Sequence, residues 1–305
     1  MLDRKSLDQA EIGTFLQAIG QAEDDSIDVA ECALLLAASE QNTASLDRYR
    51  DHLKCLVKDA QSLKSQIQAQ YNQTQYNQTQ NKTSNQAENN NPTINDCLGI
   101  IETVLYDLHG YKGDKDNYND LKNANIISVI DQRKGLPIVL GILYMHIARS
   151  LGWNVDGLNF PGHFLLRFVM GKDRQIIDPF ERGAVRNTPW LRSTLKSYLG
   201  KSAELTSDYS RSVTNRGILL RLQNNVKIRL IEAQEPEKAL LILQQMLLIA
   251  PREPSIWREA GMLQAFLNNI LAAIDTLEHY LMIEEDPRGH PEAANLLRQL
   301  KAQLN

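Results

Sequence analysis

His163 and Asp178 are two residues whose types and spacing suggest acid–base chemistry. His163 lies in LNFPGHFLLRF and Asp178 in IIDPF, and these stretches are predicted to be neighbouring strands. A histidine whose ring is oriented by an aspartate is the acid–base part of a thiol-hydrolase triad. The third member would be a cysteine at the start of a helix, where the helix dipole lowers the pKa of the thiol.

The helix expected to face this pair is predicted over residues 137–151, and its first residue is Pro137. Proline suits the first helical position because its missing N–H would have no partner there, and Gly152 is a typical helix stop. A proline offers neither a nucleophile nor an amide proton for an oxyanion, whereas covalent thiol catalysis requires a thiolate. We therefore expect no thiol chemistry at this helix start.

Three roles stay open for His163 and Asp178 without a cysteine. The pair could act as a general base on water, it could bind a carboxylate or amide group, or it could be a structural hydrogen bond between strand ends. A lone histidine among apolar residues is more often packed than catalytic, and Asp-Pro commonly initiates a turn. The basic side chains expected around the same cleft are Arg133, Lys134 and Arg167.

The composition excludes several classes of protein. A chain of 305 residues is long enough for two domains. Its 33 basic and 37 acidic side chains give a net charge of −4, which provides no electrostatic case for nucleic acid or an anionic membrane. The start, MLDRKSLDQAEIG, has no apolar signal core, and the longest apolar runs are far shorter than the roughly 20 residues of a membrane helix. We expect a cytoplasmic protein that binds neither nucleic acid nor membrane.

The cysteines and histidines suggest no metal or cofactor. Cys32, Cys55 and Cys97 are an odd number, widely spaced, and none belongs to a CxxC pair. This pattern argues against a disulfide framework and against a zinc site, and it fits a reducing compartment. The sequence also has no HExxH motif and no cluster of histidine and glutamate. We therefore expect no metal and no cofactor.

The elements that must position the pair follow from the hydrophobic pattern. Residues 27–67 are predicted to form two helices, and we assign residues 1–67 to the core domain as its N-terminal helices. Residues 68–92 are rich in Asn and Gln and contain a duplicated YNQTQ, which predicts a disordered insertion. Residues 93–205 contain helices followed by three consecutive strands, WNVDGLNF, HFLLRFVM and RQIIDPF. This order is typical of an α+β fold.

Residues 215–305 are predicted to be helical and to contain a repeat. EKALLILQQMLLIAP and LAAIDTLEHYLMIEEDP align at a shift of 34 residues, with Ala239 opposite Ala273 and a proline at the end of each. A period of 34 with a small residue early in the second helix is typical of tetratricopeptide repeats. The repeat is degenerate, because Trp257 and Gly261 have no matching residues one repeat earlier.

The block DQRKGLPIVLGILYMHIARSLGW, followed by GLNFPGHFLLRF and IIDPF, resembles the transglutaminase-like domain of the bacterial SirB regulator family. In that family the domain is followed by tetratricopeptide repeats. The resemblance implies a papain/transglutaminase-like core, with helices packed on a small antiparallel sheet. It places the catalytic cysteine of the wider superfamily at Pro137, the histidine at His163 and the aspartate at Asp178. The sequence departs from the family pattern at LKNA, residues 121–124, where members tend to read Pro-x-Asn-Ser.

These observations predict a regulatory or scaffold protein without catalytic activity, which binds a protein or peptide partner through the groove of its helical repeats. The alternative is a hydrolase or amide-processing enzyme that uses His163 and Asp178 without a cysteine nucleophile. A third hypothesis is a remnant fold that serves only as a packing core for oligomerisation. The family name implies regulation of gene expression, although the net charge argues against direct contact with DNA.

Overall fold

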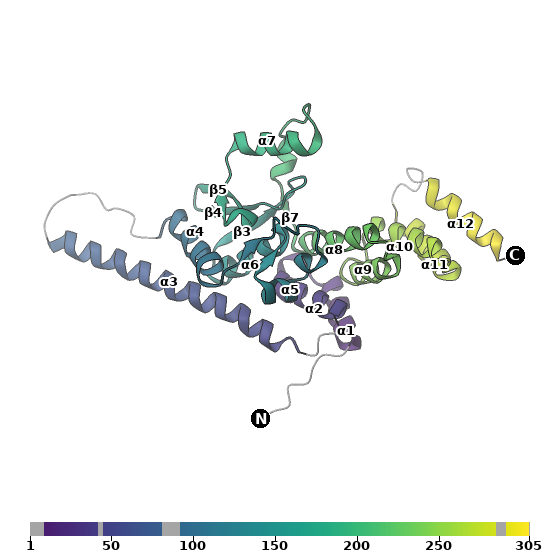
Figure 1. Ribbon diagram of the computed structural model, residues 1–305, viewed down its shortest axis with the longest axis horizontal. Coiled ribbons are helices and arrows are strands. Elements are labelled where there is room, and N and C mark those ends of the chain that lie inside the picture. The colour runs from purple at the N-terminus through teal and green to yellow at the C-terminus, as the bar shows by residue number, and fades with distance from the viewer. Residues whose placement is uncertain (1–8, 42–44, 81–91, 285–290, 305) are drawn as a thin grey trace, which may run out of the picture. The chain divides into compact units, whose positions relative to one another are not determined.

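The structure is a computed structural model that describes residues 9–41, 45–80, 92–284 and 291–304 (Figure 1). The chain divides into two compact units, Leu46–Thr214 and Met1–Ser45 with Asn215–Asn305. The first unit mixes helices with a small antiparallel sheet, and the described part of the second is helical. The predicted fold class, an α+β core with an all-α repeat module, is therefore confirmed.

The core unit contains a five-stranded antiparallel sheet in the order β6-β5-β4-β3-β7. Its strands are β3 (Asn154–Leu158), β4 (Leu166–Met170), β5 (Asp173–Asp178), β6 (Ala184–Val185) and β7 (Ser212–Val213). The tight turn between β4 and β5 uses Gly171, whose φ of 60° favours glycine. In the resulting register Leu166 lies opposite Ile177. The start of β4 therefore lies beside the end of β5.

Five helices and several short elements surround this sheet within the core unit (Figure 1). Helix α6 is buried along almost its whole length because nearly all its residues are apolar, and it packs against β3, α3 and α4. The helices are α3 (Asp47–Gln80), α4 (Ile94–Glu102), α5 (Ile126–Gln132), α6 (Pro137–Ser150) and α7 (Thr188–Leu199). The short elements are η2 (Thr103–Leu108), η3 (Leu121–Ala124), η4 (Pro179–Glu181), η5 (Ser207–Ser210) and the parallel pair β1 (Lys112–Gly113) and β2 (Lys134–Gly135).

The second unit is a stack of helices in which consecutive members pack against each other. They are α1 (Gln9–Gln21), α2 (Val29–Gln41), α8 (Asn215–Glu232), α9 (Pro236–Ile249), α10 (Pro254–Phe266), α11 (Ile270–Ile283) and α12 (Pro291–Gln303), with a short turn η1 (Asp24–Ser26). The residues aligned by the 34-residue shift are equally buried: Ala239 and Ala273 are inaccessible, and Leu240 and Ile274 are each 8% exposed. The repeat seen in the sequence is therefore a repeat of packing positions.

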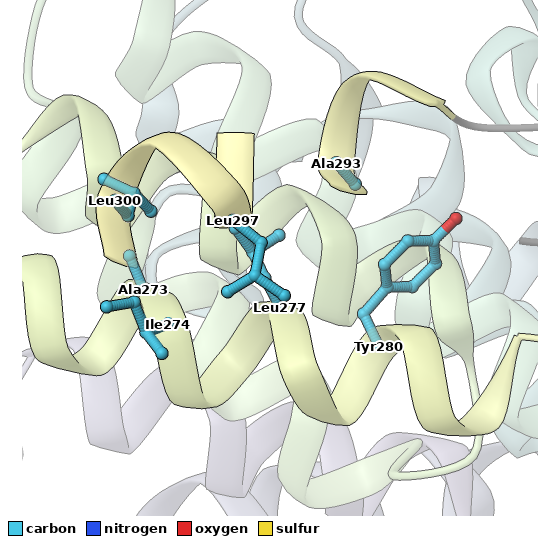
Figure 2. Close-up of a cluster of buried hydrophobic side chains, with 7 residues drawn as sticks. All are labelled: Ala273, Ile274, Leu277, Tyr280, Ala293, Leu297 and Leu300. Carbon is cyan, nitrogen blue, oxygen red and sulfur yellow. The ribbon is translucent and has the colours of Figure 1, made fainter. Parts of the chain in front are cut away.

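The last helix completes the repeat module by covering α11. Figure 2 shows Leu297 and Leu300 of α12 directed toward Ala273, Ile274 and Leu277 of α11. These side chains form one buried cluster. A terminal helix of this kind removes the apolar face that an end repeat would expose to water.

In the first repeat, buried polar side chains occupy the two positions that match Trp257 and Gly261 of the second repeat. Gly261 packs so closely on α11 that a Cβ there would lie 2.7 Å from the Leu277 side chain. One repeat earlier the equivalent residue is Lys227, which is buried and forms an ion pair with Glu259. The residue equivalent to Trp257 is Gln223, which is buried and donates a hydrogen bond from its Nε2 to Gln245 Oε1 at 3.2 Å. The first repeat therefore has polar contacts where the second has close apolar packing.

The N-terminal helices α1 and α2 belong to the repeat unit, which differs from our assignment of residues 1–67 to the core. Helix α1 packs against α9, and α2 packs against α8. Asp24 also accepts hydrogen bonds from the backbone N–H groups of Asn215 and Arg216, at 2.8 and 2.9 Å, at the start of α8. Only the segment from Leu46 onward joins the core unit. The amphipathic pattern predicted the helices correctly but did not indicate which apolar face each one covers.

The Asn/Gln-rich stretch also differs from its prediction over its first part. Helix α3 continues to Gln80, so residues 68–80 are helical rather than a disordered insertion. Tyr71 Oη donates a hydrogen bond to Asp96 Oδ2 at 2.8 Å, which ties this part of α3 to α4. Glutamine has a good helix propensity, and the helix continues from an amphipathic segment that already packs on the core. Residues 81–91 of the predicted insertion lie outside the described residues.

Candidate functional site

His163 and Asp178 lie side by side at one end of the central strands of the core sheet. Asp178 is the last residue of β5, and His163 lies in a bend before β4 begins. The pairing of Leu166 with Ile177 brings the two ends together. His163 Nε2 lies 2.9 Å from Asp178 Oδ1. The Asp178 side chain is fully buried, whereas the His163 side chain is 20% exposed, so the imidazole is the member that meets solvent.

The position of the His163 ring is fixed by a turn and by aromatic neighbours. Gly162 has a φ of 69°, and a Cβ there would lie 2.4 Å from the ring of Tyr198, so this turn requires glycine. The rings of Phe180 and Trp190 approach the imidazole edge-on, with centroids 6.4 and 5.9 Å away. These contacts hold the imidazole against Asp178.

Arg186 is a third member of the site that the sequence did not indicate. Its Nη2 and Nε donate to Asp178 Oδ2 at 2.7 and 3.1 Å. Its guanidinium also lies over the ring of Trp190, 4.3 Å from the centroid. Arg186 lies in the connection between β6 and α7, where no motif distinguishes it from any other surface arginine. Strand β6, which ends one residue before Arg186, pairs antiparallel with β5. This pairing brings Arg186 to the Asp178 carboxylate.

The surroundings keep Asp178 ionised. Burial alone would raise the pKa of this carboxyl, but hydrogen bonding and charge from His163 and Arg186 outweigh it, and the pKa lies below its ordinary range. An ionised Asp178 accepts the proton carried by Nε2 of the imidazole. Nδ1 is then the ring nitrogen through which His163 would exchange a proton with a reacting group. Such an arrangement would allow the pair to act in acid–base chemistry.

The first turns of α6 pack beside this pair. Pro137 is the first residue of the helix, and Gly141, one turn later on the same face, packs against the residues next to the pair. A Cβ on Gly141 would lie 2.6 Å from the Phe164 ring and 3.5 Å from Pro179. The N–H of Leu136, just before the proline, donates to Asn123 O at 2.9 Å, so the LKNA turn η3 holds the helix start. The structure thus places a proline at the start of the helix whose next turn packs beside the pair.

Comparison with known proteins identifies the core. A family model described as "Transglutaminase-like superfamily" matches residues 47–224, which is more than half of the chain. The chain belongs to the transglutaminase-like superfamily. A second family model, described as "Tetratricopeptide repeat", matches residues 226–305. The resemblance to the SirB regulator family, with both parts in this order, is therefore confirmed.

Relatives of this transglutaminase-like protein include several UPF0162 proteins. One from Xylella fastidiosa is 28% identical over 189 residues, 61% of this chain and 67% of the relative. One from Vibrio cholerae is 30% identical over 203 residues, 66% of this chain and 72% of the relative. F-box only protein 21 of Mus musculus is 38% identical over 84 residues, 28% of this chain and 13% of that protein. A crystal structure of menin overlaps with a TM-score of 0.40 at 9% identity, covering 92% of this chain and 71% of that one, which is too distant to support an argument.

Two of the basic residues expected around the pair in the transglutaminase-like domain, Arg133 and Arg167, bind other partners. Arg133 donates to Tyr111 Oη at 2.5 Å and contacts His52 Nε2 at 2.7 Å. Arg167 binds Asp156 at 2.9 Å. Lys134 lies in β2, paired with β1. Arg186 is the basic residue bound to the pair, because it follows the strand β6 that pairs with β5, whereas Arg133 and Arg167 lie on other segments of the core.

The transglutaminase-like domain has one group of potential metal ligands among the described residues, and it shares no residue with the pair. Cys55, Asp59 and His109 place one ligand atom each within 4.8 Å of one another. The sequence did not indicate this group, because its members come from segments about 50 residues apart. Within the described part of the chain, no helix combines the length and the apolar character needed to cross a bilayer.

Proposed function

We propose that this protein is a regulatory or scaffold protein whose transglutaminase-like domain performs no thiol chemistry and whose repeats bind a partner protein. One observation supports the first part: Pro137 occupies the first position of α6, the position to which the family resemblance assigns the cysteine of catalytic members. Helix α6 packs beside the residues next to His163 and Asp178, but a proline at its start offers no attacking atom. A domain of this shape without a nucleophile is suited to recognition.

The three cysteines of the chain do not supply a substitute thiolate. Burial raises the pKa of the Cys97 thiol to about 11 and that of Cys32 to about 12, so both are protonated at neutral pH. Cys55 is exposed, but partial loss of solvation and the neighbouring Asp59 carboxylate raise its pKa as well. A reactive cysteine needs the opposite environment, with positive charge or a helix start beside the sulfur. These thiols therefore do not replace the missing nucleophile.

The repeat module supports the second part of the proposal. Tetratricopeptide repeats generally mediate protein–protein interactions, and the module here exposes large apolar side chains. Phe266 at the end of α10 is 76% exposed, and Leu271 at the start of α11 is 68% exposed. Exposed aromatic and aliphatic residues of this size commonly anchor protein partners. We therefore place the partner contact at the turn between these two helices.

Binding of a partner can be tested by surface substitution in the full-length protein. Deletion of residues 215–305 is unsuitable, because α1 and α2 pack against α8 and α9 and would lose their cover. The full-length protein is crosslinked to proteins in a lysate of the cells that produce it. The double variant Phe266→Ser, Leu271→Ser should no longer be crosslinked to the partners that wild type captures. Leu199→Ser, an exposed apolar residue of α7, is the matched control and should keep them. If both variants retain the same partners, the α10–α11 turn is not the binding surface.

One observation favours a second candidate function, a hydrolase or amide-processing enzyme without a cysteine. The His163 imidazole is partly exposed and is held 2.9 Å from an ionised carboxylate, as a general base on water requires. The test measures hydrolysis of a panel of small esters and amides. Activity that is present in wild type, lost in His163→Ala and kept in Cys55→Ser would establish the hydrolase function. Activity that survives His163→Ala unchanged would exclude it.

A further inference from the structure

A cluster of three potential metal ligands lies on the surface of the transglutaminase-like unit, formed by Cys55, Asp59 and His109. Asp59 Oδ2 lies 2.8 Å from His109 Nε2 and accepts a hydrogen bond from Cys55 Sγ at 3.7 Å. The Cys55 side chain is exposed, while those of Asp59 and His109 are 36% and 15% exposed. The three ligand atoms therefore converge at a point that an ion can reach from solvent.

The fold holds these residues in place from two directions. Cys55 and Asp59 are one helical turn apart on α3 and lie on the same face of it. His109 follows the wider helical turn η2, which packs against α3, and Gly110 with a φ of 68° ends that segment. The ring of His52 meets the His109 ring edge-on, with centroids 5.3 Å apart. Each ligand is thus supported by an ordered element of the core.

We propose that Cys55, Asp59 and His109 bind a divalent transition-metal ion, with Zn²⁺ as the best fit. One sulfur, one imidazole nitrogen and one carboxylate oxygen are ligands that Zn²⁺ accepts, and three protein ligands leave a fourth tetrahedral position for water or a partner group. A thiolate and a carboxylate also carry two negative charges, which balance the ion. In a tetrahedral site the ligand atoms lie about 3.5 Å apart, so the present spacing requires only small side-chain movements.

The charges around the cluster are of both signs, because Lys58 and Arg133 as well as Asp59 act on the Cys55 thiol. Lys54 forms an ion pair with Asp51 at 3.2 Å. Arg133 is held by Tyr111 Oη and His52 Nε2, at 2.5 and 2.7 Å. Lys54 and Arg133 therefore have partners of their own outside the cluster.

A nucleophilic Cys–His–Asp triad fits the same residues less well. In a triad the thiol faces the imidazole, whereas here Cys55 Sγ hydrogen-bonds the carboxylate. Cys55 also lies in the interior of α3, far from the helix start that would stabilise a thiolate. A bound metal ion would favour the thiolate form of Cys55, because the ion displaces the thiol proton. The neighbouring carboxylate would then stabilise the ion.

Cobalt titration of the full-length protein, after removal of metal with a chelator, tests the site. Co²⁺ serves as the spectroscopic probe for Zn²⁺, and wild type should bind one equivalent with a thiolate-to-cobalt charge-transfer band that Zn²⁺ abolishes. Cys55→Ser should lose the band, and His109→Gln should weaken Zn²⁺ binding by at least about tenfold. Cys97→Ser is the matched control and should behave like wild type.

Thermal melting provides a second readout that separates misfolding from loss of the site. Zn²⁺ should raise the Tm of wild type and of Cys97→Ser, but not that of Cys55→Ser or His109→Gln, while the metal-free variants melt near the wild type. The proposal is overturned if wild type gives no thiolate band at stoichiometric Co²⁺. It is equally overturned if the band persists in Cys55→Ser.

Discussion

Asp178 divides its two carboxylate oxygens between two side chains, with Oδ1 2.9 Å from His163 Nε2 and Oδ2 2.7 Å from Arg186 Nη2, while Oδ1 also accepts a hydrogen bond from the Phe180 backbone N–H at 3.1 Å. The carboxylate is fully buried, so each partner offsets part of the cost of removing its charge from water. A buried aspartate that orients a histidine needs only the first contact. The second contact anchors the connection after β6 to the end of β5, which gives Asp178 a structural role in addition to any chemical one.

Asp178→Asn should destabilise the protein by about 3 kcal/mol, because the amide leaves the partly buried guanidinium of Arg186 without its counter-charge. Urea unfolding of the full-length protein measures this loss. Asp173→Asn, at the exposed first residue of β5, is the matched control and should change the free energy of unfolding by less than about 0.5 kcal/mol. Equal stabilities of the two variants would show that the buried carboxylate is not needed for the fold.

Gly141→Ala should also be destabilising, by about 1–3 kcal/mol, because the new methyl group overlaps the Phe164 ring. Gly99→Ala provides the opposite case, since no atom lies within 4 Å of a Cβ at that position of α4. There the better helix propensity of alanine should stabilise by up to about 1 kcal/mol. Chemical denaturation of both variants gives the comparison, and a neutral Gly141→Ala would mean that α6 does not pack closely beside the pair.

Pro137→Cys tests whether the helix start still has the geometry of a nucleophile position. The introduced thiol should have a pKa at least about one unit below that of a free cysteine, because of the helix dipole and the imidazole of His163. The pH dependence of its alkylation rate, in a background with Cys55→Ser, gives the pKa. Adding His163→Ala should raise the pKa again. If the thiol at residue 137 has the same pKa with and without His163→Ala, residue 137 does not face His163.

His52 should make the stability of the metal-free protein depend on pH in mildly acidic solution. Its pKa is about 4 in the folded state, through burial and the charge of Arg133, against 6.5 for an ordinary histidine. Between these values the unfolded chain binds a proton that the folded chain does not, so the free energy of unfolding should fall as pH decreases from about 6.5 to about 4. His52→Gln should flatten this part of the curve measured in urea with a chelator. An unchanged curve would assign the dependence to other groups.

Local patterns in the sequence determined the repeat, the helix that begins at Pro137 and the strands that carry Asp178 and the approach to His163. These features depend on hydrophobic spacing within a few turns or one strand pair, so a single chain contains the information. The antiparallel turn at Gly171 also fixes which strand ends meet. The pairing of His163 with Asp178 follows from that register, and the family resemblance followed from the same blocks.

Tertiary structure alone decided which side chains from distant segments came together. Arg186 reaches Asp178 because β6 pairs with β5, Arg133 turns to Tyr111 instead, and His109 meets Cys55 across the contact between η2 and α3. It also decided that α1 and α2 cover the repeat helices, since an amphipathic pattern states that a face is buried but does not name its partner. Long-range contacts depend on how all the elements pack at once, and no short stretch of sequence records that outcome.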